Sequence, residues 1–211
     1  IIVLTSVLLY LFLMCWLTGY GPLKQNVYNS YALQADSWRQ GRLDLGQDYP
    51  YLELAVYNGK YYVSFPPFPS YILFPLTFIF GSNTPDALLM WFISLLSAGY
   101  LYRLALQFRL SEPLSALTTL TVILGSNTTF NMLNPGVWFF AQNLCFLLAV
   151  MTIYYAGNGK GGWALFFWAC SVGCRPMQIF FLPVVLLILY IVEKKKSPEL
   201  SGKKIVSNKI Y

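Results

Sequence analysis

The 211 residues of this chain are 57% hydrophobic and only 10% charged, with a formal net charge of +6. An average soluble domain carries about 25% charged residues, so the composition argues against a water-soluble fold. Several apolar runs approach the roughly 20 residues that a helix needs to cross about 30 Å of hydrocarbon. Such helices also satisfy their own backbone amides inside a bilayer. We therefore predict an all-α polytopic membrane protein with about six transmembrane helices, in a single transmembrane domain covering residues 1–211.

The first predicted span runs from Ile1 to Thr18 and leads into a polar segment from Gly21 to Pro69. Because the chain opens inside an apolar run, we expect it to be a piece of a longer protein. The polar segment holds half of the eight acidic residues of the chain, namely Asp36, Asp44, Asp48 and Glu53. We predict that residues 21–69 form a large first external loop.

Two local structures are predicted within this loop. Apolar residues recur at helical spacing from Val27 to Gln40, and Gly41 follows where a helix C-terminus favours glycine. This pattern predicts an amphipathic helix lying in the membrane interface. From Leu52 to Val63, β-forming residues flank Asn58-Gly59, a strong signal for a two-residue hairpin turn.

The loop ends in three prolines, Pro66, Pro67 and Pro69, which predict an extended stretch because proline lacks an amide donor and restricts its predecessor. The apolar segment from Tyr71 to Phe80 that follows is short. We expect it to be a re-entrant or interfacial helix rather than a span.

Five further spans are predicted after this helix. Arg103, Arg109 and Lys160 then fall on the side of the basic tail, which the positive-inside rule places in the cytoplasm. The lysines of that tail therefore indicate orientation rather than a nucleic-acid partner. The tail lysines are Lys194, Lys195, Lys196, Lys203, Lys204 and Lys209, and the five spans are Asp86 to Gln107, Pro113 to Gly125, Trp138 to Ala156, Trp163 to Cys174 and Met177 to Val192.

Most chemical templates are absent from the sequence. The chain has no histidine, which excludes a histidine-based triad and the common zinc motifs. No glycine-rich phosphate loop follows a predicted strand, and the four cysteines have neither metal-ligand nor disulfide spacing. We expect no cofactor; a divalent metal ion stays open, but nothing indicates one.

Arg175 is the most distinctive single residue, because an arginine within an apolar stretch costs several kcal/mol unless it is paired. We interpret it as a contact for a lipid phosphate; the alternative is an arginine that reaches the outer headgroups.

Among the loop carboxylates, Asp48 and Glu53 flank an aromatic stretch that predicts a partly water-excluded setting, which could raise a carboxyl pKa toward that of a general base. The alternative is a solvated surface. Asp36 is expected to form an ion pair on the helix that also carries Arg39.

Several short motifs resemble the first external loop of membrane glycosyltransferases of the C superfamily. They are Tyr31-Ala32 with Gly41 ten residues after the tyrosine, Tyr57-Asn58-Gly59-Lys60-Tyr61-Tyr62 and Phe65-Pro66-Pro67. That superfamily includes the family-39-like protein O-mannosyltransferases, the aminoarabinose transferases of lipid A and the catalytic subunit of oligosaccharyltransferase. Gly173-Cys174-Arg175-Pro176, with Pro183, resembles the outer end of a span where those proteins have a lysine or arginine.

The resemblance implies a polyprenyl-phosphate-linked sugar donor, an inverting transfer, and a catalytic carboxylate in the first external loop. One departure is important: the acidic pair that precedes the matching tyrosine in the better-known branches is Val27-Tyr28 here. The chain resembles a less characterised branch in which an acidic residue precedes Leu-Ala, so the catalytic candidates are Glu53 first and then Asp48. The candidates for binding substrate are Arg175, Lys60, Tyr61, Tyr31, Asn29 and Asp36.

The predicted function is therefore transfer of a sugar to a lipid or glycan acceptor at the external face of a membrane, most simply the plasma membrane of a prokaryote. Two other classes stay open. A degenerate, non-catalytic protein that binds lipid-linked sugar is supported by the missing acidic pair. A transporter would also use broken helices, but it would concentrate polar groups near the midplane rather than at one face.

Overall fold

The computed structural model describes residues 1–19 and 21–196, and within them the chain is predominantly helical with one small sheet. The predicted tail signal at Lys203, Lys204 and Lys209 lies outside the described residues. The helices and strands are α1 (Ile2–Thr18), α2 (Ser30–Arg39), β1 (Leu54–Tyr57), β2 (Lys60–Val63), α3 (Phe68–Phe80), α4 (Asp86–Gln107), α5 (Glu112–Leu124), α6 (Thr128–Leu133), α7 (Val137–Gly157), α8 (Gly161–Val172) and α9 (Leu182–Lys196), with short 3₁₀ helices η1 (Gly81–Asn83) and η2 (Pro176–Phe181).

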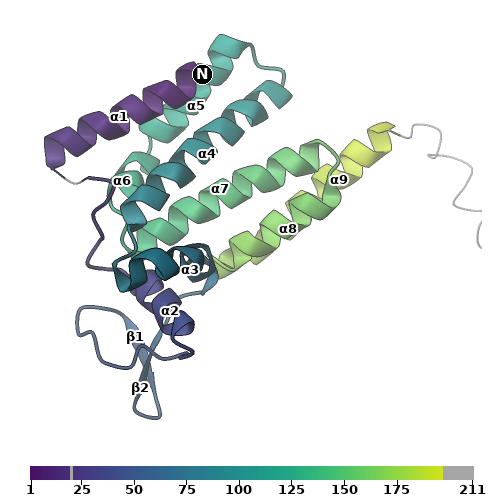
Figure 1. Ribbon diagram of the computed structural model, residues 1–211. Coiled ribbons are helices and arrows are strands. Elements are labelled where there is room, and N and C mark those ends of the chain that lie inside the picture. Colours follow the sequence, from purple (N-terminus) through teal and green to yellow (C-terminus); the bar gives the residue numbers. More distant parts are fainter. Residues whose placement is uncertain (20, 197–211) are drawn as a thin grey trace, which may run out of the picture.

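The apolar helices form a bundle in which successive members run in opposite directions (Figure 1). Three helical segments among the described residues are long and apolar enough to cross a membrane: α4, α7 and the segment Pro176–Lys195. The helical content confirms the all-α class, and the length and composition of these three segments are consistent with a membrane protein. The shorter apolar helices α1, α5 and α8 have 17, 13 and 12 residues, or about 18–26 Å at 1.5 Å per residue, so six crossings stay a prediction.

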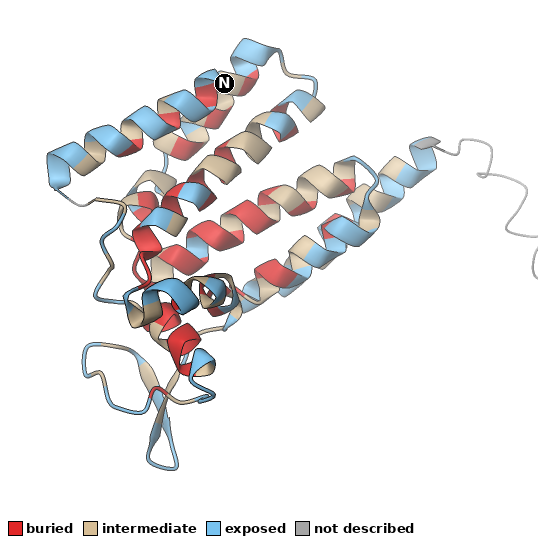
Figure 2. Ribbon diagram, viewed as in Figure 1, coloured by how far each residue is buried: buried red, intermediate tan, exposed pale blue. Residues whose placement is uncertain are grey.

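The core of the bundle surrounds α7. In its most apolar stretch, 56% of the residues are buried, against 6% in the equivalent stretch of Pro176–Lys195. Met90 of α4 and Phe140 of α7 are fully buried in the largest cluster, whereas α1, α8 and α9 leave large apolar side chains exposed along their outer faces (Figure 2). A chain with this distribution buries polar backbone inside helices and presents hydrocarbon outward, as a bilayer requires.

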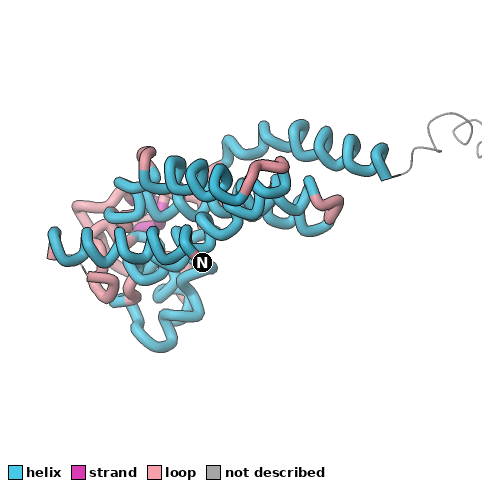
Figure 3. Tube along the Cα trace, turned by 90° about the horizontal axis from the view of Figure 1, so that it is seen from above, coloured by secondary structure: helices cyan, strands magenta, loops and turns pink. Residues whose placement is uncertain are grey.

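The hairpin is confirmed. β1 and β2 pair antiparallel, with Leu54 opposite Val63, and the turn has positive φ at Asn58 (49°) and Gly59 (71°). Positive φ at both central residues is the type I′ geometry that matches strand twist, and asparagine and glycine accept it at least cost. The two strands and the longest loops lie at one end of the helices, seen from above in Figure 3.

The predicted amphipathic helix begins later than expected, and its polar face is only partly solvated, since Arg39 and Gln40 are exposed. α2 starts at Ser30 rather than Val27, and its polar residues Gln34 and Asp36 are both only 8% exposed. The reason is that α2 packs against α3, where the Ser70 hydroxyl donates to the Gln34 Oε1 atom at 2.7 Å. Most of α2 is therefore buried against other parts of the protein, and only its C-terminal end is exposed.

The proline segment also differs from the prediction. α3 begins at Phe68, so that Pro69 lies in the first helical turn instead of extending the chain, and Pro75 lies inside the helix. The first turn accepts proline because its amides have no partner within the helix. This start brings the Phe68 amide within 3.2 Å of the carbonyl oxygen of Gly173, two residues before Arg175.

Candidate functional site

The candidate site lies where the start of α7 and the junction of α8 with η2 meet α2 and α3. Arg175 is the extended residue before η2, with φ −141° and ψ 107°. Gly173 permits the close approach of α3 to this junction, because a Cβ atom there would lie 2.9 Å from the Cβ of Phe68. The sequence thus places an arginine on a tight turn that other elements enclose.

The Arg175 guanidinium is only partly satisfied by the chain. Its Nη2 atom donates to the Trp138 carbonyl oxygen at 2.6 Å, and its Nε atom is buried with no acceptor among the described residues. A buried donor without a partner costs about 1–3 kcal/mol. A guanidinium has five N–H donors in a planar fork that suits phosphate and carboxylate. The arrangement can therefore bind an anion.

Aromatic rings pack around Trp138, the residue whose carbonyl oxygen accepts from Arg175. Tyr28 and Trp138 have ring centroids 5.3 Å apart, and Phe65, at the root of the hairpin, lies 6.4 Å from both Trp138 and Tyr31. These distances are typical of packed aromatic pairs. These packed rings connect Phe65, which follows the hairpin, to Trp138 at the start of α7.

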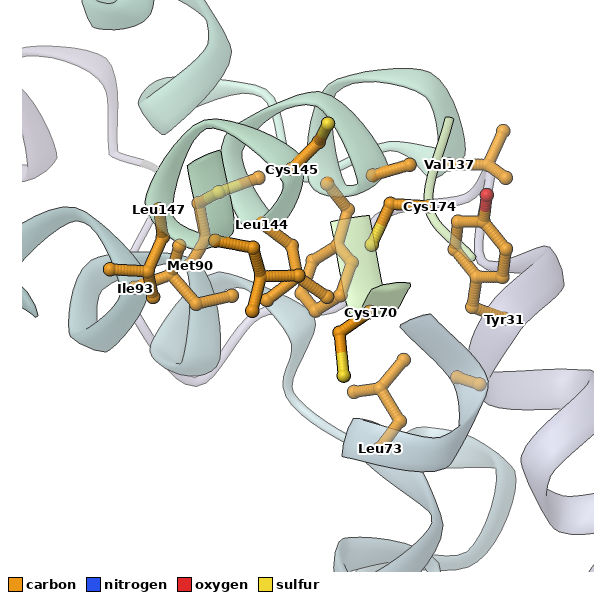
Figure 4. Packing of buried hydrophobic residues seen from close by; sticks show 14 of the residues in the cluster. Tyr31, Leu73, Met90, Ile93, Val137, Leu144, Cys145, Leu147, Cys170 and Cys174 are labelled. Atoms are coloured by element: carbon orange, nitrogen blue, oxygen red, sulfur yellow. The ribbon is translucent and has the colours of Figure 1, made fainter. Parts of the chain in front are cut away.

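Tyr31 is buried at 3% exposure, at the edge of the core cluster near Val137 and Cys174 (Figure 4). Burial raises the pKa of the Tyr31 hydroxyl well above its usual range, and the nearby positive charge of Arg175 lowers it by less. The hydroxyl is therefore protonated at neutral pH and available as a donor. The structure thus brings together Tyr31 and Arg175, two of the predicted binding residues.

Asn29 lies immediately before α2, and its Oδ1 atom is buried without a donor among the described residues. It lines a small cavity of about 10 Å³ together with Tyr28, Tyr31 and Asp86. This volume is enough for about one water molecule. Asn29 is therefore adjacent to Tyr31, and the role of both residues in binding substrate stays a prediction.

Asp86 is a residue of this region that the sequence analysis treated only as the start of a span. It is the first residue of α4 and is 3% exposed. Both of its carboxylate oxygens lie within hydrogen-bond distance of the Asn26 amide, at 3.1 and 3.2 Å. A carboxylate at the positive end of a helix is a recognisable local signal, but its partner is 60 residues away in sequence, where no local pattern identifies it.

Asp36 has the ion pair that its position predicts. Its Oδ1 atom lies 2.7 Å from Arg39 Nη2, and its Oδ2 atom accepts from Gln40 at 2.7 Å. All of these partners belong to α2 or its C-terminus. Asp36 is therefore engaged in structure, and its predicted role in binding substrate is untested.

Lys60 and Tyr61 lie on the hairpin, which projects beyond the bundle in Figure 1. Lys60 Nζ lies 3.3 Å from Asp44 Oδ2, and the Leu45 amide donates to the Tyr61 carbonyl at 2.9 Å. Partial desolvation raises the pKa of Asp44, but hydrogen bonds from Lys60 and from the Gly46 amide lower it more, to a net value below its ordinary range. These contacts fix the loop to the hairpin and leave 61% of the Lys60 side chain exposed.

Both catalytic candidates, Glu53 and Asp48, are exposed, so the water-excluded setting expected for them is not formed. The physical reason is that Tyr49 and Tyr51 pack against each other, with centroids 6.1 Å apart, instead of covering the carboxylates. The Glu53 backbone carbonyl accepts from Ser64, which ties it to the end of β2. Neither carboxylate is brought to Arg175 by a contact that the structure defines.

A large cavity lies elsewhere, at the opposite end of the bundle. It has a volume of about 840 Å³ between α1, α4 and α5, and its walls are mainly apolar, with Arg103 and Glu112 among the lining residues. It has no residue in common with the Arg175 site. No group of three or more potential metal-binding side chains occurs in the described part of the chain.

Comparisons of the chain with protein-family models, with curated proteins and with solved structures found no match.

Proposed function

We propose that the chain is the membrane domain of a glycosyltransferase that moves a sugar from a polyprenyl-phosphate donor to a lipid or glycan acceptor. The observation that carries this proposal is the Arg175 guanidinium, which one backbone carbonyl holds while its Nε atom is buried without an acceptor in the described part of the chain. An anionic ligand would satisfy that donor, and a phosphate on a long isoprenoid would reach it from the bilayer. The resemblance of the surrounding motifs to C-superfamily transferases is the reason for proposing that this phosphate carries a sugar.

The proposed topology has six crossings, with α1, α5 and α8 added to the three long helical segments. Arg103, Lys160 and Lys194 then lie at the end of the bundle that faces the cytoplasm, according to the positive-inside rule. α2, the hairpin and Arg175 lie at the external end, on the outer face of a prokaryotic plasma membrane. The short helices would be accommodated by tilt or a locally thinner bilayer at modest cost.

In the proposed reaction, a carboxylate of the external loop removes the proton from the acceptor hydroxyl. The hydroxyl oxygen attacks the anomeric carbon, the bond from that carbon to the phosphate oxygen breaks, and the configuration inverts. Arg175 stabilises the negative charge on the departing phosphate, and Trp138 and Phe65 offer faces for the sugar or isoprenoid. Glu53 and then Asp48 are the proposed bases, and the bound acceptor must supply the dry surroundings that their exposure lacks.

The test is transfer of radiolabelled sugar from polyprenyl-phosphate donors in membranes that contain the protein. Arg175→Ala should reduce transfer on the order of a hundredfold, as loss of a charge-stabilising donor does. Glu53→Gln should abolish it at unchanged protein level. Arg42→Ala, which removes an exposed loop arginine bonded to Gln40, is the matched control and should leave transfer unchanged. Equal transfer by wild type and Arg175→Ala would disprove the proposal.

A second candidate is a non-catalytic protein that binds lipid-linked sugar. The observation in its favour is the exposure of Glu53 and Asp48, which leaves the Arg175 site without a defined base. The two functions differ in outcome. A binding protein would lose donor affinity in Arg175→Ala but would show no transfer with any donor, and Glu53→Gln would change nothing.

A further inference from the structure

A continuous set of contacts leads from a buried carboxylate to the proposed anion site. Its first member is Asp86, whose two oxygens both face the amide of Asn26 at the start of the loop. Removing a carboxylate from water is costly unless hydrogen bonds compensate. Asp86 is 3% exposed, and Asn26 is the partner from outside α4 that compensates it. The contact fixes the entry of the loop to the first turn of a long helix.

The second step passes from Asn26 to Tyr28. The Asn26 side-chain oxygen accepts from the Tyr28 amide at 2.8 Å, a local turn that sets the direction of the chain. The Tyr28 carbonyl then accepts from the Val137 amide at 2.9 Å, which attaches the loop to the first residue of α7. A Cβ atom at Gly136 would lie 3.4 Å from the Asn26 oxygen, so the segments are in close contact.

The third step reaches the arginine. The Tyr28 ring packs on Trp138 at 5.3 Å, and the Trp138 carbonyl is the acceptor that orients the Arg175 guanidinium. Apart from the local turn between Asn26 and Tyr28, the links join segments distant in sequence: α4 to the loop, the loop to α7, and α7 to Arg175 before η2. A change at the first link can therefore move the last.

We propose that Asp86 is a positioning residue that holds Arg175 in its anion-binding orientation through Asn26, Tyr28 and Trp138. The inference rests on the proposed function only in that Arg175 binds the donor phosphate. Asp86 itself does not touch the ligand. When its carboxylate is removed, the Asn26 amide loses its acceptor, the Tyr28 ring is no longer fixed against Trp138, and Arg175 loses its alignment.

The experiment is an equilibrium titration of the full chain in detergent micelles with a polyprenyl monophosphate. The variants are Asp86→Ala, Asp86→Asn, Tyr28→Ala, the double variant of Asp86→Ala with Tyr28→Ala, and Arg175→Ala. Glu112→Ala is the matched control, since Glu112 is likewise an acidic first residue of a helix, at the other end of the bundle. The thermal midpoint of every variant is measured in parallel, so that loss of folding is separated from loss of affinity.

We expect Asp86→Ala to weaken binding on the order of tenfold, the range in which changes along a packed network act. Asp86→Asn should retain most of the affinity, because its amide oxygen can still accept from Asn26. The double variant should bind no more weakly than the weaker single variant, since both break the same series of contacts. Glu112→Ala should bind as wild type does.

The outcomes separate the two proposals. Wild-type affinity in Asp86→Ala with a loss in Arg175→Ala would overturn the positioning role and leave the anion site standing. Wild-type affinity in both would overturn the anion site, and the positioning role with it. A lower thermal midpoint in Asp86→Ala with an unchanged dissociation constant would show that Asp86 serves stability alone. Additive losses of affinity in the double variant would show that Asp86 and Tyr28 act on binding independently, and would overturn the proposed series of contacts.

Discussion

Two regions at the loop-bearing end of the molecule contain the same kinds of side chain in opposite situations. In the junction of α2, α7 and η2, charged and polar groups are buried, and several of their atoms lack a partner within the described chain. In the hairpin and the loop before it, charged groups pair with each other or face solvent, as Lys60 does with Asp44. The difference is that polar atoms of the junction are buried without a partner in the described chain, whereas the charged groups of the hairpin are paired or solvated.

The largest difference between the junction and the hairpin is expected in ligand affinity when a positively charged side chain is removed from each. Arg175→Ala should weaken binding of a polyprenyl monophosphate on the order of a hundredfold, because a desolvated cation has no water to replace it. Lys60→Ala should change it by less than about twofold, because exposed pairs contribute little. The dissociation constants from titration check this, and equal losses would remove the distinction between the regions.

A second test uses glycines. Gly173→Ala should destabilise the protein by about 1–3 kcal/mol, the range for overpacking, because the new methyl group would meet Phe68 at 2.9 Å and the Cys170 carbonyl at 3.2 Å. Gly162→Ala is the control within the same helical segment, since nothing lies within 4 Å of its Cβ position. The thermal midpoint in detergent measures both, and a Gly173→Ala midpoint equal to wild type would mean that α3 does not pack this closely.

A third test compares two serines that each donate one hydrogen bond. Ser70→Ala should cost about 1–2 kcal/mol, because the buried Gln34 oxygen loses its donor. Ser64→Ala removes an exposed bond to the Glu53 carbonyl and should stay within about 0.5 kcal/mol. The thermal unfolding midpoints of the two variants measure this difference. A larger destabilisation by Ser64→Ala than by Ser70→Ala would contradict the assignment of Ser70 to a buried region and Ser64 to a solvated one.

The smallest effect is a pH dependence confined to the hairpin. The pKa of Asp44 is below its ordinary value of 3.8 in the folded loop, so the unfolded form binds more protons in the acid range. The stabilisation is therefore complete above that ordinary value and is lost as the pH falls through the lower, folded value. Hydrogen exchange of the Leu45 and Gly46 amides, corrected for the intrinsic rate, should accelerate as the pH falls through the folded-state pKa of Asp44. Asp44→Asn should exchange faster already at neutral pH and show no acid step.

Several elements were predictable from sequence because their causes are local. Asp86 to Gln107 was predicted as a span and is α4, since an uninterrupted apolar run of that length has few other options. The Asn58-Gly59 pair predicted where the hairpin turns, because the geometry of a two-residue loop depends on those residues alone. The Asp36 pair with Arg39 follows from helical spacing.

The remaining features depended on the tertiary structure, because they arise from contacts between segments far apart in the chain. Burial of the polar face of α2 required α3, and the exposure of Glu53 and Asp48 followed from how Tyr49 and Tyr51 pack. The contact of Asp86 with Asn26 joins residues 60 positions apart. By itself the sequence determined the apolar helices, the turn and the presence of an unusual arginine. Only the fold decided that Arg175 keeps a buried donor with no acceptor among the residues that the structure describes, because pairing and burial depend on neighbours from α7 and η2.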